Sequence, residues 1–485
     1  MSTAVRDAET AAPAKKIAIF IVTYNAVSTL TQVLDRIPEE IWEKVAEVFV
    51  FDDSSQDDTY LVGLGYKAHH GKAKLTVLRH EENHGYGGNQ IQGYKYAIEK
   101  GYDIVALLHG DGQYAPEALP LLLEPLEKGE ADAVFGSRMM TRGAALEGGM
   151  PAYKYVGNKI LTSFENALLG MNLSEFHSGY RLYSVPALAK LPFAHNTWDF
   201  HFDTQIIIQM HAAGMRIVER PIPTYYGDEI CHVDGVRYAK DVVRSVLEFR
   251  MHELGLLRRP EYEIEAPDYS VKSSNLSSHS QLLTMVGPPP RTVLDVGCGS
   301  GEFAGLLEER GHRVTGIDSR PPSTPPSEFI EGNLAEGLPL DPQRTFDVVV
   351  LGDVLEHMAE PERLLAAARA HVAPGGKLLV SLPNAVHWSV RTQVARGNFE
   401  YTNRGLLDRG HLRFFTTKTA TRLFESSGLR VVEHRVTPIP WERVVPGGPA
   451  RIVGRTIEQA DYLLARLRPG LFAYQNIFEL TPSGG

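Results

Sequence analysis

Two residues of the first half have types and spacing that suit divalent metal chemistry. Asp111 is followed two positions later by Gln113, and together they offer a carboxylate and a carbonyl oxygen. Oxygen ligands suit Mg²⁺ or Mn²⁺, and such a cation stabilises a leaving diphosphate by spreading its developing charge. Upstream, Asp52 or Asp53 ends an apolar run and offers acceptors to a nucleoside base or ribose. These residues indicate a site for a nucleoside diphosphate and a cation.

The second half carries a glycine-rich turn with a different chemistry. Asp295 precedes Gly297, Gly299 and Gly301, and a helical pattern begins directly afterwards. Glycines in such a turn let the backbone approach a nucleotide-like ligand. Asp318 ends the next strand pattern, where a carboxylate accepts both ribose hydroxyls. A dinucleotide-binding domain shares this arrangement, so the turn alone leaves NAD and S-adenosylmethionine both open.

Strand and helix patterns alternate along both halves and must position these residues. Apolar runs predict strands at 17–22, 45–51, 75–78, 104–108 and 133–135, and again at 292–296, 313–317, 346–351, 377–381, 430–434 and 472–480. The alternation predicts an α/β chain with a parallel, doubly wound sheet, whose ligands bind beyond the carboxyl ends of the strands. Amphipathic helices are predicted at 238–257 and 451–467. The first has a composition that suits a membrane surface, but core packing is the favoured interpretation.

Size and composition set the organisation of the chain. Its 485 residues predict more than one domain: a disordered tail at 1–15, a first domain at 16–257, a linker at 258–273 and a second domain at 274–485. The net charge of -10 argues against a nucleic-acid binder. Cys231 and Cys298 have no paired or metal-ligand spacing, which indicates a reduced, cytoplasmic protein. No apolar run is long enough to span a bilayer, so a lipid substrate would be met at the membrane surface.

Six short motifs of the first half occur in a familiar order. They are Thr-Tyr-Asn at 23–25, Asp-Asp-Ser-Ser at 52–55, Asn-His-Gly-Tyr-Gly-Gly at 83–88, Asp-Gly-Gln at 111–113, Gly-Ser-Arg at 136–138 and Ser-Gly-Tyr-Arg at 178–181. This order resembles the family 2 glycosyltransferases of the GT-A fold, in particular dolichyl-phosphate mannose synthase and its bacterial polyprenyl-phosphate relatives, over about 16–257. The resemblance implies a nucleotide-sugar site formed by Thr23, Tyr24, Asn25, Asp52, Asp53 and Gly88, a metal held by Asp111 and Gln113, and phosphates faced by Arg138 and Arg181.

Two departures from the family pattern bear on the metal. His109 stands where an aspartate usually begins the metal loop, and Ala26 stands where a glutamate is common. A neutral imidazole can still bind Mn²⁺, so His109 joins the predicted ligands, but the lost negative charge weakens the site or changes its metal preference.

The acceptor of the first half stays open between two chemistries. A polyprenyl phosphate is already an ionised nucleophile and needs cations, a role that Arg138, Arg142 and Arg181 fit. A hydroxyl acceptor, as on a glycan, needs a carboxylate base instead, and Asp199 or Asp203 is the candidate.

Motifs of the second half separate the two cofactors left open above. Gly-Asp-Val-Leu-Glu-His at 352–357, Pro-Gly-Gly at 374–376 and the segment 408–416 resemble class I methyltransferases of the ubiquinone-biosynthesis O-methyltransferase type. The resemblance implies an antiparallel last strand and S-adenosylmethionine as cofactor. It also implies ligand contacts by residue: Asp295 and the glycines at the methionine end, Asp318 at the ribose, Asn333 and Leu334 at the adenine, and Asp353 on the floor. No Asn-Pro-Pro-Tyr stands at 352–357, which disfavours a nucleic-acid base methylase.

A histidine is expected to remove the proton from the methylated hydroxyl, whose own pKa is too high for it to ionise unaided. His411 is the candidate base, with His357 and His387 as alternatives.

The leading hypothesis is a bifunctional enzyme of glycan or glycoconjugate synthesis. It transfers a sugar from a nucleoside-diphosphate sugar to a polyprenyl phosphate or glycan, and a methyl group from S-adenosylmethionine to a hydroxyl, which is expected on the glycan product. It is expected in the cytoplasm, with peripheral contact at the inner face of the membrane, as a monomer or an oligomer. Two alternatives stay open: a methyltransferase with a degenerate nucleotide-sugar module, and a pair of activities on a small natural product.

Overall fold

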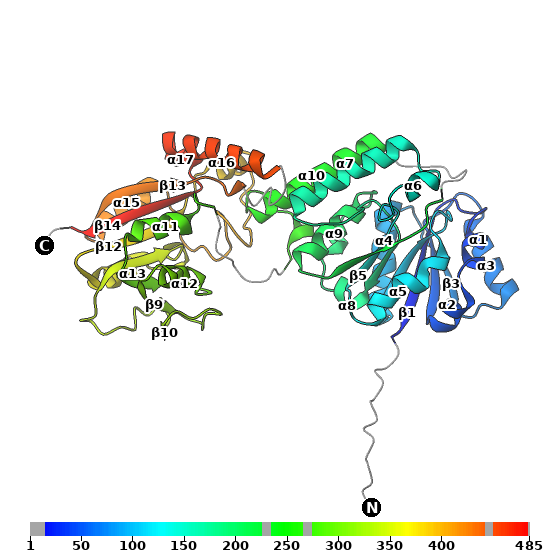
Figure 1. Cartoon of the computed structure of the whole chain (residues 1–485), viewed down its shortest axis with the longest axis horizontal. Helices are drawn as coiled ribbons and strands as arrows, with labels where there is room; N and C mark the ends of the chain where they lie inside the picture. The colour runs from blue at the N-terminus through cyan, green and yellow to red at the C-terminus, as the bar shows by residue number, and fades with distance from the viewer. Residues whose placement is uncertain (1–14, 226–233, 265–273, 442–449, 484–485) are drawn as a thin grey trace, which may run out of the picture. The chain divides into compact units, whose positions relative to one another are not determined.

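The computed structural model describes residues 15–225, 234–264, 274–441 and 450–483 (Figure 1). The chain divides into two compact units. The first comprises residues 1–166, 171–246 and 260–266, and the second comprises 167–170, 247–259 and 267–485. The predicted tail lies outside the described residues except for Lys15, as do Cys231 and positions 265–273 of the predicted linker.

A seven-stranded sheet forms the centre of the first unit, in the order β3-β2-β1-β4-β6-β5-β7. Its strands are β1 (Ile17–Thr23), β2 (Glu47–Asp52), β3 (Leu75–Arg79), β4 (Ile104–His109), β5 (Ala133–Ser137), β6 (Arg181–Ser184) and β7 (Ile217–Pro221). Strands β3, β2, β1 and β4 run parallel, so their carboxyl ends meet at one edge. That edge holds the motifs at 23–25, 52–55 and 109–113.

Helices cover both faces of this sheet. The helices up to the end of this region are α1 (Leu30–Asp35), α2 (Glu39–Lys44), α3 (Thr59–His70), α4 (Gly85–Glu99), α5 (Leu119–Glu127), α6 (Ala144–Glu147), α7 (Ala152–Leu169), α8 (Val185–Leu188), α9 (Phe202–Ala212) and α10 (Gly235–Glu253); the last residues of α7 and α10 belong to the second unit. The odd-numbered isoleucines of β1 pack with α1, α2, α3 and α5 in one core. The opposite face presents Phe20, which Gly93 of α4 approaches so closely that an added Cβ would lie 2.1 Å from the ring. Alternation of side chains along β1 therefore supplies two cores at once.

The second unit has its own seven-stranded sheet, in the order β10-β9-β8-β11-β12-β14-β13. The strands are β8 (Thr292–Val296), β9 (Arg313–Asp318), β10 (Glu328–Glu331), β11 (Phe346–Gly352), β12 (Val372–Pro383), β13 (Leu429–Thr437) and β14 (Gln475–Pro482). The helices are α11 (Ser278–Val286), α12 (Glu302–Glu309), α13 (Pro361–Ala370), α14 (Trp388–Ala395), α15 (Thr417–Ser426), α16 (Ala450–Leu467) and α17 (Pro469–Phe472). Strand β14 pairs antiparallel with both β12 and β13, which confirms the antiparallel last strand.

The two α/β sheets confirm the predicted fold class, with differences in detail. Strands β6, β7 and β10 were not predicted, and the last strand begins at Gln475 rather than at 472. The first sheet is mixed, because β6 runs antiparallel to β4 and β5. Four residues beginning with a charged arginine give β6 no apolar run to recognise.

The two amphipathic helices differ in what their apolar residues contact. Val242 and Val246 of α10 are buried, and so is Leu254, which directly follows the helix, as expected for core packing. In α16, Ile452, Leu463 and Leu467 are exposed. Among the described residues, no helix combines the length and apolar character that crossing a bilayer requires.

Candidate functional sites

The turn after β2 is held by its own carboxylates. Asp52 is fully buried, lies 3.4 Å from Nε of Arg79 and accepts hydrogen bonds from the amide and hydroxyl of Ser55. Asp53 is also buried, and its Oδ1 accepts from the amide of His84 at 2.8 Å. Burial raises the pKa of Asp53 above its ordinary value. Of the two predicted nucleoside contacts, Asp53 is the one that does not have an arginine as partner.

The neighbouring turn after β1 is tied to the same loop. Thr23 is buried, and its hydroxyl donates to the carbonyl oxygen of Phe51 at 3.1 Å. Asn25 has a positive φ of 50°, its amide donates to Ser55 at 2.8 Å, and its side chain accepts from Gln56 at 2.9 Å. Tyr24 between them is 42% exposed, so its ring is available to a ligand.

The metal loop after β4 presents one exposed carboxylate. Asp111 accepts the amide of Gln113 at 3.0 Å, which closes a tight turn through Gly112 at a φ of 78°. His109 is instead enclosed: a Cβ on Gly179 would lie 2.5 Å from its ring, and its Nε2 has no hydrogen-bond partner among the described residues. Burial lowers the pKa of His109, so the imidazole is neutral near pH 7. A cation held by Asp111 would take most of its remaining ligands from phosphate oxygens and water.

Gly88 lies where α4 packs against a loop. A Cβ at this position would meet the side chain of His84 at 2.8 Å and Trp198 at 3.2 Å. The glycine therefore permits a close approach within the protein, and its contact with the nucleotide sugar stays a prediction.

Arg138 lies in a buried ion pair. It is 7% exposed, its Nε donates to Glu175 at 3.0 Å, and its backbone amide donates to the same carboxylate at 2.7 Å. Although burial opposes ionisation of Glu175, the charge and hydrogen bonds of Arg138 hold its pKa below the ordinary value. The guanidinium predicted to face phosphates is therefore satisfied by protein acceptors.

Arg181 is enclosed in the same way. Its nitrogens donate to the carbonyl oxygens of Ser178, Asp203 and Phe176 at 2.7–3.0 Å, and it is 1% exposed. Asp203 accepts from the hydroxyl of Tyr86 at 2.9 Å and lies 3.6 Å from Arg181. This predicted base is thus also engaged.

The glycine-rich turn of the second unit has the backbone that its sequence predicts. Gly297, Gly299 and Gly301 all have positive φ, at 75°, 55° and 83°. A Cβ on Gly301 would lie 1.9 Å from the carbonyl oxygen of Thr324, whereas one on Gly299 would meet nothing within 4 Å. Gly299 therefore faces open space, and Gly301 allows the chain to pack on itself.

Two carboxylates adjoin this turn. Asp318 accepts the amide of Gly299 at 2.9 Å. Asp295 is 4% exposed, and its Oδ2 has no hydrogen-bond partner among the described residues. Burial, together with the nearby charge of Asp318, raises the pKa of Asp295 to about 7. A cationic ligand group at this place would favour the ionised carboxylate and so oppose both effects.

The other predicted cofactor contacts lie at neighbouring strand ends. Asp353 has a strained positive φ of 56° and accepts hydrogen bonds from Ser381 at 2.7 Å and Gln475 at 2.8 Å. Leu334 lies 3.7 Å from the place of a Cβ on Gly297, beside the glycine-rich turn. Asn333 is exposed and caps its own turn through the amide of Ala335.

The structure brings His411 and one alternative, His357, together. Their rings are 4.9 Å apart, and with the buried Glu356 they form a group whose potential metal-ligand atoms lie within 4.8 Å of one another. Burial and the charge of His357 lower the pKa of His411, which keeps it an unprotonated base near neutral pH. His387 lies elsewhere: it caps α14 through Ser389, and burial lowers its pKa to about 4.

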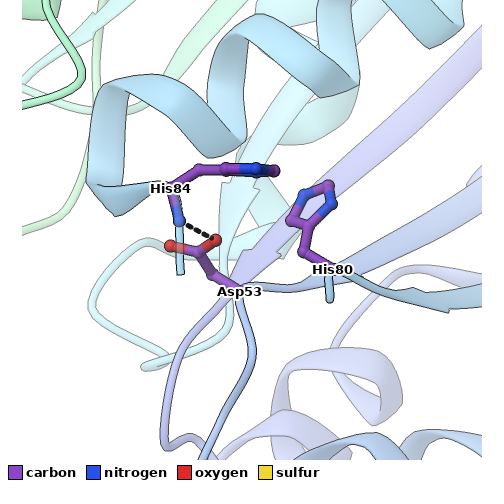
Figure 2. A group of neighbouring side chains, drawn as sticks. All are labelled: Asp53, His80 and His84. Atoms are coloured by element: carbon purple, nitrogen blue, oxygen red, sulfur yellow. Dashed lines mark hydrogen bonds between the residues drawn. The ribbon is translucent and has the colours of Figure 1, made fainter. Parts of the chain in front are cut away.

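Two further groups of this kind occur in the part of the chain that the structure describes. One joins Asp199, His201 and Asp241, but Arg237 already pairs with both aspartates, at 3.1 and 3.8 Å. The other joins Asp53 with His80 and His84 (Figure 2). Neither histidine was predicted as a site residue, and the signal available in the sequence is their separation by four positions.

Comparison with known proteins relates each half of the chain to a family of transferases. Residues 18–191 match the model of glycosyl transferase family 2, and residues 274–434 match a methyltransferase domain. The undecaprenyl-phosphate mannosyltransferase of Micrococcus luteus is 30% identical over 211 residues, which are 43% of this chain and 82% of that protein. The ubiquinone biosynthesis O-methyltransferase of Coxiella burnetii is 28% identical over 180 residues, 34% of this chain and 74% of that protein. A solved structure of glucosyl-3-phosphoglycerate synthase from Mycobacterium tuberculosis aligns at 18% identity and a TM-score of 0.37, covering 48% of this chain and 78% of that one.

The fold and the two strand-end sites thus define a fusion of two transferase domains. The chain belongs to glycosyl transferase family 2 and carries a methyltransferase domain after it. These findings confirm the pairing predicted from the motifs.

Proposed function

We propose that the chain is a bifunctional enzyme that transfers a hexose from a nucleoside-diphosphate sugar to a polyprenyl phosphate and a methyl group from S-adenosylmethionine to a hydroxyl. We propose the domain boundaries predicted from the sequence: a glycosyltransferase domain at 16–257 and a methyltransferase domain at 274–485. The observation that carries the first activity is the similarity to an undecaprenyl-phosphate mannosyltransferase over 82% of its length. A methyl acceptor within the glycan product is the simplest link between the two activities.

The engaged carboxylates support a phosphate acceptor over a hydroxyl. A hydroxyl acceptor needs a free carboxylate base, but Asp203 is hydrogen-bonded to Tyr86, and Asp199 pairs with Arg237. An ionised phosphate monoester attacks without a base. Arg142, which is exposed, is our candidate for contacting it.

The donor site is proposed at the shared strand edge. Asp53 and Tyr24 would contact the nucleoside, and Asp111 with Gln113 would hold Mg²⁺ or Mn²⁺ against the diphosphate. The exposed Asp111 supports this role, since a cation there keeps positions open for phosphate oxygens.

The methyl-transfer site is proposed around the glycine-rich turn. Asp295 and Asp318 would face the methionine end and the ribose of S-adenosylmethionine, with Leu334 and Asn333 near the adenine and Asp353 below. The buried Oδ2 of Asp295, which has no hydrogen-bond partner among the described residues, supports a ligand that carries an ammonium group, since a cation there would favour the ionised carboxylate. His411 would accept the proton of the hydroxyl.

We also propose peripheral contact with the cytoplasmic face of a membrane through α16; for α10, core packing was already the favoured interpretation. The outward face of α16 presents apolar side chains flanked by arginines. Its exposed members are Ile452, Ile457, Leu463, Leu464, Leu467, Arg455 and Arg466, and the exposed Arg468 follows directly. Its acidic residues Glu458 and Asp461 point inward and bond Ser274 and Ile439. An apolar band edged by cations suits an anionic lipid surface.

Transfer of labelled hexose from nucleotide sugars to undecaprenyl phosphate, with Mn²⁺ present, tests the glycosyl activity. The expected product extracts into organic solvent, and Asp111→Asn should lower its rate of formation by about 100-fold or more. Nucleotide-sugar binding without transfer to any lipid or glycan would instead identify a binding module.

Co-sedimentation with anionic vesicles tests the membrane contact. Leu463→Glu should release the protein, whereas Leu61→Glu, an exposed leucine on α3, should not. Equal sedimentation of both variants with the wild type would rule out α16.

A further inference from the structure

Asp53, His80 and His84 form a compact group of metal-ligand atoms at the end of the first sheet. Asp53 follows β2, His80 follows β3, and His84 precedes α4, so the three residues come from neighbouring turns at one edge (Figure 2). One potential ligand atom from each residue lies within 4.8 Å of those from the other two. A single ion between them could contact all three with small side-chain adjustments.

The three side chains are shielded and already held in place. Asp53 is 3% exposed and the side chain of His84 is 17% exposed. The amide of His84 donates to Asp53 at 2.8 Å, and the ring of His84 packs edge-on to Trp198 at 5.3 Å. Nε2 of His80 lies 3.2 Å from Oδ1 of Asn89, whose amide nitrogen donates to Phe51 at 3.1 Å. Ligands fixed before binding lose little conformational entropy when a metal arrives.

One donor atom of the group lacks a partner. Nδ1 of His84 is buried and forms no hydrogen bond with any described residue, while Nε2 lies 4.0 Å from Glu82. A buried imidazole nitrogen without a partner is costly, and coordination of a cation would satisfy it.

We propose that Asp53, His80 and His84 bind a divalent transition metal of the zinc class, separate from the oxygen-ligand site of Asp111. Two imidazoles with one carboxylate suit Zn²⁺, Co²⁺ or Ni²⁺ better than Mg²⁺. Three protein ligands leave at least one position for water or a ligand oxygen, with the Asn89 amide oxygen adjoining the group. The ion would cross-link the turns after β2 and β3 to the start of α4. This inference rests on the geometry of the group and does not depend on the proposed function. If both hold, the nucleoside would meet Asp53 through the open position of the ion.

Co²⁺ is the probe, because its visible absorption reports nitrogen and oxygen coordination directly. The full chain is stripped with a chelator and titrated with Co²⁺ in excess Mg²⁺, which occupies oxygen-ligand sites. All measurements use a His357→Ala background, so that the group at Glu356 does not contribute. We expect one equivalent of Co²⁺ to bind. His80→Ala and His84→Ala should each weaken Co²⁺ binding by about 100-fold or more, because each removes a direct ligand. Zn²⁺ should displace the Co²⁺.

His195→Ala is the matched control, since His195 is an exposed histidine of the same unit outside the three groups. It should leave Co²⁺ affinity unchanged. Zn²⁺ should also raise the melting temperature of the parent protein but not that of His80→Ala, which separates loss of the site from loss of folding. Unchanged Co²⁺ affinity and spectrum in both His80→Ala and His84→Ala would overturn the proposal. Its failure would leave hexose transfer untouched, and a lack of transfer would leave the Co²⁺ result standing.

Discussion

The two strand-end sites differ in whether their charged residues have partners of opposite charge within the protein. In the first unit, Arg138 pairs with Glu175, Arg181 lies beside Asp203, and Asp52 lies beside Arg79. In the second unit, Asp295 and Asp318 adjoin the glycine-rich turn, and the pKa of Asp295 is raised by burial and by its neighbour's charge. Charged residues that pair within the protein hold the fold together. Two neighbouring carboxylates without a cationic partner favour a ligand that carries positive charge.

The comparison also separates motif residues that are available to a ligand from motif residues whose polar atoms are bonded within the protein. Arg138 and Arg181 belong to the motifs of the glycosyltransferase family, yet their donors are taken up by protein oxygens. Asp111 belongs to the same motif set and is exposed. The predictions below change members of each kind in turn.

Arg138→Ala should produce the largest loss of stability. Removing one partner leaves the carboxylate of Glu175 buried and uncompensated, which costs about 3–5 kcal/mol. Urea unfolding followed by a probe in the first unit measures this loss. Arg142→Ala, an exposed neighbour, should change stability by less than about 0.5 kcal/mol. Equal stability of the two variants would return Arg138 to the phosphate-binding role that its motif implied.

Asp111→Asn should lower hexose transfer by about 100-fold or more, the order expected when electrostatic stabilisation of a transition state is removed. Methyl transfer and unfolding should be unchanged, because Asp111 is exposed and contributes one local hydrogen bond. Asp132→Asn, which removes a surface partner of Arg216, is the control. A similar loss in both activities would mean that the substitution acts through folding.

Asp295→Asn should change how stability depends on pH. The folded pKa of about 7 lies above the unfolded value of 3.8, so between these values the folded state holds a proton that the unfolded state has released. Stability of the wild type therefore falls as pH rises through this window, by at most about 1.4 kcal/mol per pH unit. The variant lacks this slope and should gain on the wild type up to about pH 7. Parallel curves for the two proteins would show that Asp295 ionises normally.

Gly299→Ala should lower the stability of the second unit only moderately, by about 1–2 kcal/mol, because of its left-handed backbone. Gly301→Ala should cost more, because its Cβ would also collide with the carbonyl of Thr324. Binding of S-adenosylmethionine by calorimetry sharpens the contrast: Gly299→Ala should weaken it despite mild destabilisation, since that glycine faces open space. Full affinity in Gly299→Ala would place the ligand elsewhere.

Much of the fold followed from apolar runs and the loops that end them. Strands β1 to β5 were predicted because each contains a short, mostly apolar run that ends at a polar loop; β8 and β11 were predicted in the same way, and β9 from β-branched residues before Asp318. Strands β6, β7 and β10 are short and carry charged residues, so their sequences lack a period that could be recognised. Pairing with neighbours distant in sequence creates these strands.

The location of each site could be predicted from the sequence, whereas the contacts of its side chains were harder to predict. Parallel strands bring their carboxyl ends to one edge, so Thr23, Asp53 and His109 could be expected near each other. That Glu175 would satisfy Arg138 depends on the path of the chain after α7, which no local pattern encodes. The approach of His80 and His84 to Asp53 likewise depends on three turns folding together.

Gln475 has a practical consequence for anyone who divides this protein. Its amide reaches Asp353 from β14, and β14 is also the strand that attaches β13 to the sheet. A recombinant fragment trimmed where the methyltransferase match stops, at residue 434, would omit this strand and leave its sheet with an open, unpaired border. Expression of the second half alone should therefore extend at least through Pro482 if a competent catalyst is wanted.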